Sequence, residues 1–240
     1  MNDNFQDFFS DSIIKFESMI KSNKFLFFDT EEFESIIIYY LESGNSSMAN
    51  KALKMAIEQY PKNTSILLLK VEALIFENKI EEAEKIIDSL YEIDKNNSEI
   101  IIQKSRILSK RKKHSKSINL LKKIDKDCEF YSDALIMTGK EYLFIDNFEN
   151  AKEKFKEYIK DYQLDYAVLN NLLYCFDALG NTDDTINYLN NFLEENPYCE
   201  VAWHQLGKQY LKKELFKEAL TAFDFAIISD DSFVGAYLEM

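Results

Sequence analysis

The sequence predicts an all-α fold in which antiparallel helix pairs repeat along the chain. First, its 240 residues include only five glycines and two prolines, whereas the turns of a β-sandwich or barrel consume many of both. Second, both prolines and four of the glycines keep one register of 34 residues. Third, apolar residues in each period lie three, four or seven positions apart, which places them on one stripe of a helix.

A leading helix is expected over residues 4–22, before the first repeat. Its apolar stripe consists of Phe5, Phe9, Ile13, Phe16 and Ile20. We expect this helix to cover the open apolar edge of the first repeat, as terminal caps do in such arrays. The aromatic residues of the connector Lys24–Phe28 should also pack. Residues 1–29 thus form a capping helix and connector, and Asp29 with Glu32 forms a capping box that opens the next helix.

Six repeats follow without insertion or deletion: 30–63, 64–97, 98–131, 132–165, 166–199 and 200–233. Helix A of each repeat should occupy about the first fourteen positions and helix B positions 17–29. Gly44 and Gly180 stand at position 15, where a left-handed residue ends helix A. Position 20 is small, since two helix backbones approach closely only where side chains are short. Its residues are Ala49, Ala83, Ser117, Ala151, Thr185 and Ala219.

The repeat resembles the tetratricopeptide repeat, a helix–turn–helix with Leu-Gly at positions 7 and 8, Tyr at 11, Ala at 20 and Pro at 32. The sixth repeat matches most fully, in Trp203, Leu206, Gly207, Tyr210, Ala219, Phe223 and Ala226. The third matches least, with Lys104 and Ser105 in place of Leu-Gly. The resemblance implies an α-solenoid, a right-handed superhelix whose A helices line a concave groove suited to a peptide or partner helix.

The resemblance also places positions 2, 5, 6, 9, 12 and 13 of helix A in that groove. In repeats three to six these positions supply cations, amides, one tyrosine and one histidine as predicted partner-binding residues: Gln103, Arg106, Lys110, Lys140, Asn170, Asn171, Tyr174, His204, Gln205 and Lys208. The first two repeats offer Glu31, Glu34, Glu42 and Glu72 instead. The third repeat carries ten basic and four acidic residues, so the expected partner is a protein or peptide with acidic segments.

Two features leave alternatives open. The basic run Lys110–His114 falls at a helix–helix turn and reads either as a docking patch or as a solvated turn with intramolecular ion pairs. Residues 234–240 begin a seventh repeat, and one turn cannot bury the open face of the sixth. Either the natural chain continues past Met240, with this array as a regulatory arm of the longer polypeptide, or the edge meets another copy and forms a homo-oligomer.

Other classes of function are disfavoured by composition. A formal charge of −13 opposes binding to nucleic acid or anionic membranes, and the longest apolar run, Ile36–Leu41, is too short to span a bilayer. Three cysteines without CxxC spacing indicate reduced thiols in a cytoplasmic protein, with no zinc site. Neither a nucleophile motif nor a phosphate-binding glycine loop is present, so we expect no enzyme, no cofactor and no metal. The predicted function is a non-catalytic protein-interaction scaffold.

Overall fold

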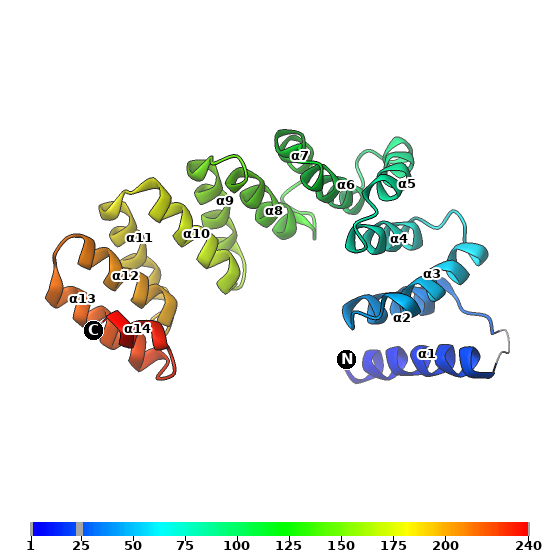
Figure 1. Ribbon diagram of the computed structural model, residues 1–240, viewed down its shortest axis with the longest axis horizontal. Coiled ribbons are helices and arrows are strands. Elements are labelled where there is room, and N and C mark those ends of the chain that lie inside the picture. Colours follow the sequence, from blue (N-terminus) through cyan, green and yellow to red (C-terminus); the bar gives the residue numbers. More distant parts are fainter. Residues whose placement is uncertain (1, 23–25, 240) are drawn as a thin grey trace. The chain divides into compact units, whose positions relative to one another are not determined.

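The computed structural model describes residues 2–22 and 26–239, with side chains from Asp11 onward. In this part of the chain every regular element is a helix (Figure 1). The helices are α1 (Asn2–Ser22), α2 (Thr30–Glu42), α3 (Ser46–Gln59), α4 (Thr64–Phe76), α5 (Ile80–Ile93), α6 (Ser98–Lys110), α7 (His114–Leu121), α8 (Tyr131–Leu143), α9 (Phe148–Asp161), α10 (Tyr166–Leu179), α11 (Thr182–Glu195), α12 (Glu200–Lys212), α13 (Phe216–Ser229) and α14 (Val234–Glu239). The even-numbered helices from α2 to α12 are the predicted A helices, and the odd-numbered ones from α3 to α13 are the B helices.

The chain divides into two compact units, Met1–Ala134 and Leu135–Met240. In the N-terminal unit, α2 packs on α3, α4 on α5 and α6 on α7, while α4 also contacts the neighbouring A helices α2 and α6. In the C-terminal unit, α9 packs on α10, α11 on α12, and α12 on α13. Each unit is therefore a stack of antiparallel helix pairs, which confirms the predicted all-α solenoid class.

Polar side chains in the connections cap seven of the described helices. Asp29 accepts a hydrogen bond from the Glu32 backbone amide at 2.8 Å, and the Glu32 carboxylate accepts one from the Asp29 amide at 2.9 Å. This is the predicted capping box. The last residue of a repeat caps the next A helix in the same way at Asn63, Asn97 and Asp165. These caps satisfy amides that would otherwise lack a partner at the helix start.

The turn between helix A and helix B passes through left-handed backbone at position 15 in all six repeats. Gly44 and Gly180 have φ of 71° and 68°, as predicted for helix-ending glycines. The same position holds a non-glycine residue with φ between 54° and 60° in the other four repeats: Asn78, Lys112, Asp146 and Glu214. The same turn geometry therefore recurs in all six repeats, including the four in which a non-glycine residue at position 15 makes a positive φ unfavourable.

Small residues bring paired helices together. All six residues at position 20 are buried. At position 8, a Cβ atom added to Gly139 would lie 2.4 Å from the Phe155 ring, and one added to Gly207 would lie 2.4 Å from the Phe223 ring. The phenylalanine at position 24 of helix B therefore occupies space that only a glycine on helix A leaves free.

The leading helix differs from its prediction in which side chains it buries. Phe16 and Met19 are buried in the core that also contains Phe28, while Ile20 remains 37% exposed. The buried stripe runs through residues three and four apart, so the helix is rotated toward Met19. In the connector Phe28 is buried as expected and Phe27 is 66% exposed. The side chains of Phe5, Phe9, Lys24 and Phe25 lie outside the described residues.

The second helix of repeat three is shorter than its predicted range of 114–126, since α7 ends at Leu121. Beyond it the Lys123 and Ile124 amides bond three residues back, to Leu120 at 3.1 Å and Leu121 at 3.0 Å. The next residues are lysines and aspartates around a single buried apolar side chain, Ile124. With so little apolar surface to bury, this segment forms tight turns instead of another helical turn.

Candidate partner-binding surface

The A-face of each unit is the surface formed by helix A side chains at positions 2, 5, 6, 9, 12 and 13. In the N-terminal unit these side chains meet along the stack. Arg106 on α6 donates from Nη1 to Glu72 Oε1 on α4 at 3.4 Å, and both residues hold position 9. Ser65 on α4 hydrogen-bonds the Glu34 carboxylate on α2. Arg106, a predicted binding residue, is therefore already paired with a neighbouring repeat.

Two carboxylates on this A-face have no cationic partner among the described residues. Burial raises the pKa of Glu99 on α6, and the neighbouring carboxylates Glu34, Glu72 and Glu129 raise it further. Burial also raises the pKa of Glu34; the Ser65 hydrogen bond opposes this, and Glu31 adds to it. Both pKa values rise because the charged form is partly desolvated beside like charges.

The other predicted residues of this unit differ in exposure. Gln103 is only 5% exposed, and its Oε1 atom is buried with no hydrogen-bond partner. It lies one helical turn after Glu99, on the same stripe of α6. Lys110 is exposed at the end of α6. Gln103 therefore lies beneath the A-face, whereas Lys110 lies at its edge.

In the C-terminal unit a polar network joins α10 to α12 around Asp177. The Asp177 carboxylate accepts hydrogen bonds from Gln205 Nε2 at 2.9 Å, Gln209 Nε2 at 2.9 Å and Lys212 Nζ at 2.8 Å. Burial raises the pKa of Asp177, but the bonds from Lys212, Gln209 and Gln205 outweigh burial and lower it overall. Gln205, expected in the groove, is 7% exposed and belongs to this network. The sequence analysis did not select Asp177 or Gln209. An acidic residue at position 12 of repeat five and an amide at position 10 of repeat six are the sequence features that could have identified them.

Five predicted residues remain available on the A-face of this unit. Lys140, Asn170 and Tyr174 are exposed, and Asn171 and Lys208 are half-buried. Lys140 on α8, Tyr174 on α10 and Lys208 on α12 all hold position 9. The Tyr174 ring rests edge-on against Phe148, with centroids 5.9 Å apart, yet stays 57% exposed. Neither lysine forms an ion pair with the residues that the structure describes.

His204 does not present its ring to a groove. The ring packs 5.8 Å from that of Phe223 and 5.3 Å from that of Phe233, and its Nε2 atom is buried without a partner. Burial lowers the pKa of His204, and the nearby Lys208 lowers it further. The side chain thus helps to hold the start of repeat seven, where it lies near Gly235.

The basic run at 110–114 is partly neutralised within the chain. Arg111 forms ion pairs with Glu81 at 2.9 Å and Glu84 at 3.1 Å, both on α5. Lys112 and Lys113 are exposed in the turn, where Lys112 has φ of 58°. The sequence left two interpretations of residues 110–114 open, a docking patch or a solvated turn with intramolecular ion pairs. Arg111 fits the second.

Two of the three cysteines are buried free thiols. Cys175 is buried, and burial raises its pKa to about 11. Burial also raises the pKa of Cys199. Within the described residues, no group of three or more metal-ligating side chains comes together. None of the helices described here has the length and apolar character needed to cross a membrane.

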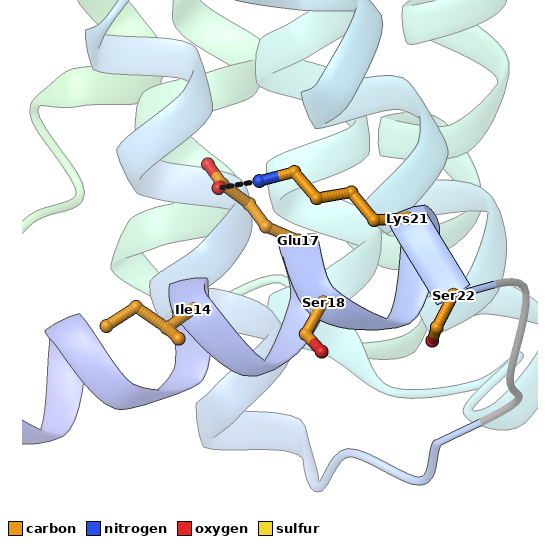
Figure 2. A pocket seen from close by; sticks show the side chains of 5 residues that line it. All are labelled: Ile14, Glu17, Ser18, Lys21 and Ser22. Atoms are coloured by element: carbon orange, nitrogen blue, oxygen red, sulfur yellow. Dashed lines mark hydrogen bonds and ion pairs between the residues drawn. The ribbon is translucent and has the colours of Figure 1, made fainter.

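A shallow hollow of about 380 Å³ lies along α1 (Figure 2). The side chains that line it come from one helix: Ile14, Glu17, Ser18, Lys21 and Ser22. Lys21 Nζ pairs with Glu17 Oε2 at 3.4 Å across one helical turn. Because no second helix contributes to the lining, this hollow lacks the convergent groups of a ligand site.

Stacked helix pairs with a polar A-face define the chain as an α-solenoid of the protein-interaction class. Residues 40–100 match the family model described as tetratricopeptide repeat. The match covers the end of repeat one, repeat two and the start of repeat three, and the described helices have the fold of tetratricopeptide-repeat arrays. No curated protein matches the sequence.

Solved structures of tetratricopeptide-repeat proteins are similar in fold. YrrB, described as a TPR protein with an unusual peptide-binding site, is 17% identical, with a TM-score of 0.55 over 78% of this chain and 97% of YrrB. PilF of Pseudomonas aeruginosa is 14% identical, with a TM-score of 0.62 over 87% of this chain and 95% of PilF. A tetratricopeptide repeat protein from Parabacteroides merdae is 16% identical, with a TM-score of 0.56 over 86% and 82% of the two chains. At these identities the likeness concerns the fold alone.

Proposed function

We propose that the chain is a non-catalytic cytoplasmic scaffold whose C-terminal unit binds an acidic, extended segment of a protein partner. The binding surface is the A-face of that unit, with Lys140, Lys208, Tyr174 and Asn170 as its main contacts. The observation that carries this proposal is the pair of lysines at one position of α8 and α12, neither of them paired with a described carboxylate.

The chemistry of these side chains suits an acidic peptide. Each lysine offers three N–H donors to a carboxylate, and such charge-assisted bonds are stronger than neutral ones. Tyr174 adds an exposed ring that is held by Phe148, so it can contact an apolar side chain at low entropic cost. The Asn170 carboxamide can bond the backbone of an extended segment. Peptide binding by YrrB, which has the same fold, is consistent with this use of the surface.

Binding of a labelled peptide of about ten residues, alternating glutamate and alanine, tests the proposal by fluorescence anisotropy. Replacing Lys140 and Lys208 by glutamate should lower the affinity at least about tenfold, since two attractive contacts become repulsive. The matched control replaces Lys160 and Lys217, which are exposed on the B helices α9 and α13. Equal losses in the two double variants would refute a specific site. Tyr174→Ala should weaken binding without any change of charge.

A second candidate function is self-association through the C-terminal edge. Large apolar side chains are exposed on α13 and α14: Phe216 is 66% exposed, Ile228 72%, Tyr237 53% and Leu238 80%. A second copy offers the same apolar surface, so two edges can cover each other in a symmetric dimer. Sedimentation velocity should then show a dimer that Ile228→Glu with Leu238→Glu dissociates. A parent chain that stays monomeric at every concentration would exclude this candidate.

A further inference from the structure

The A-face of the N-terminal unit carries a charge arrangement that the acidic-peptide site does not explain. Glu34 on α2 lies close enough to Glu99 on α6 for its charge to raise the pKa of Glu99, and α4 contacts both of their helices. Glu72 on α4 is neutralised by Arg106, but Glu34 and Glu99 form no ion pair with any described residue. Two partly buried carboxylates thus share one face without a counter-ion.

A second observation on the same face also points to a missing donor. Gln103 follows Glu99 by one helical turn and is 95% buried, and its Oε1 atom has no hydrogen-bond donor. An acceptor buried without a donor is unfavourable, and most such atoms in proteins are paired. Its carbonyl adds partial negative charge beneath Glu99. The face therefore presents two carboxylates without a cation, of which Glu34 is hydrogen-bonded by Ser65, and one buried amide oxygen without a donor.

We propose that this A-face binds a basic segment of a partner protein, with lysine or arginine side chains received by Glu34 and Glu99. Guanidinium and ammonium groups carry only donors, so they suit carboxylates that have no cation of their own. In an extended segment, side chains two residues apart point to one side, so basic residues at alternate positions can face this surface together. Phosphate-bearing ligands are repelled by the same charges.

This site is independent of the acidic-peptide site proposed for the C-terminal unit, because it lies in the other compact unit and selects the opposite charge. A result on one site therefore leaves the other untouched. The natural partner need only carry one basic stretch, which is the kind of segment that an extended chain places on an array of A helices.

The experiment measures anisotropy of a labelled peptide of about ten residues, alternating arginine and alanine, with the full chain at physiological salt. At that ionic strength the general attraction of a chain with net charge −13 is largely screened. Replacing Glu34 and Glu99 by glutamine should lower the affinity at least about tenfold, since two charge-assisted contacts are lost. Gln103→Leu should lower it by a smaller factor of about two to five.

The matched control replaces Glu58 and Glu82 by glutamine. These residues are exposed on the B helices α3 and α5 of the same unit, and the change in net charge is the same. Affinity of this control within about twofold of the parent, together with the tenfold loss above, supports the site. Equal losses in both double variants would overturn it. Displacement of the labelled peptide by spermine as readily as by unlabelled peptide would overturn the assignment to a protein segment.

Discussion

Replacement of Asp177 by alanine should loosen the contact between repeats five and six. Two of its three hydrogen-bond donors, Gln205 and Gln209, are 7% and 1% exposed, so the change leaves two buried amide groups without an acceptor. A buried donor without a partner costs about 1–3 kcal/mol. The ion pair to Lys212 is half exposed and adds little. We therefore expect a loss of about 2–3 kcal/mol in the free energy of unfolding of this region.

The only tryptophan, Trp203, reports on this region because it lies on α12 with Gln205 and Gln209. Its Nε1 atom donates to the Pro197 carbonyl at 2.8 Å, and its ring stacks on Phe225 with centroids 4.7 Å apart. Urea unfolding followed by its fluorescence should show the midpoint falling by about 1 M. A local probe is needed because repeats in such arrays can unfold separately.

The control for this experiment is Asp183→Asn, which removes the charge of an exposed ion pair with Lys213. Its effect should stay below about 0.5 kcal/mol. The folded-state pKa of Asp177 is lowered from its ordinary value of 3.8, so the stabilisation is present above that pH and is lost as pH falls through the lowered pKa. Parent and Asp177→Ala should thus converge in strong acid. Equal midpoints for the Asp177 and Asp183 variants at pH 7 would refute the reasoning.

Three further predictions use other groups. Glu99→Gln should raise the thermal midpoint by about 1–2 °C at pH 7 but not in acid. The reason is that a carboxylate with a raised pKa destabilises the fold as pH rises through that pKa. Thermal unfolding followed by circular dichroism at both pH values tests this. Because positions 44 and 214 have left-handed backbone, Glu214→Gly should raise the free energy of unfolding by about 0.5–1 kcal/mol and Gly44→Ala should lower it by about 1 kcal/mol. Urea midpoints that move in the opposite directions would contradict this. Because the pKa of His204 is lowered from 6.5, docking of α14 should weaken as pH falls through the lowered pKa. Amide protection factors of residues 234–239, corrected for the intrinsic exchange rate at each pH, should fall in acid in the parent and not in His204→Phe.

The sequence predicted the helix pairs well because their register depends on local features. Small residues at position 20, Gly44 and Gly180 at the turns, and the Asp29–Glu32 capping box each act within one or two turns of a helix. The leading helix was harder, because the choice between Met19 and Ile20 as the buried residue depends on how α1 rotates against α2.

The candidate site was less predictable for the same reason. Position numbers identify which side of a helix a residue occupies, but not what the next helix places opposite it. Arg106 meets Glu72, and Gln205 meets Asp177, across pairs of helices 34 and 28 residues apart in sequence. The His204 ring is partly buried because Phe223 and Phe233 of the same repeat pack against it, and its position number alone does not reveal these contacts.

Charge pairing across A helices is available everywhere in this fold, so its absence at Glu34 and Glu99 is informative. Glu72 receives Arg106 from the next A helix, and Asp177 receives Lys212 together with two amides. From α4, Ser65 hydrogen-bonds Glu34, and no described cation forms an ion pair with Glu34 or Glu99. Packing therefore does not dictate the uncompensated charge, and that charge lowers stability at neutral pH. A feature that reduces stability without a packing reason is typical of binding surfaces, where the missing cation comes from the partner.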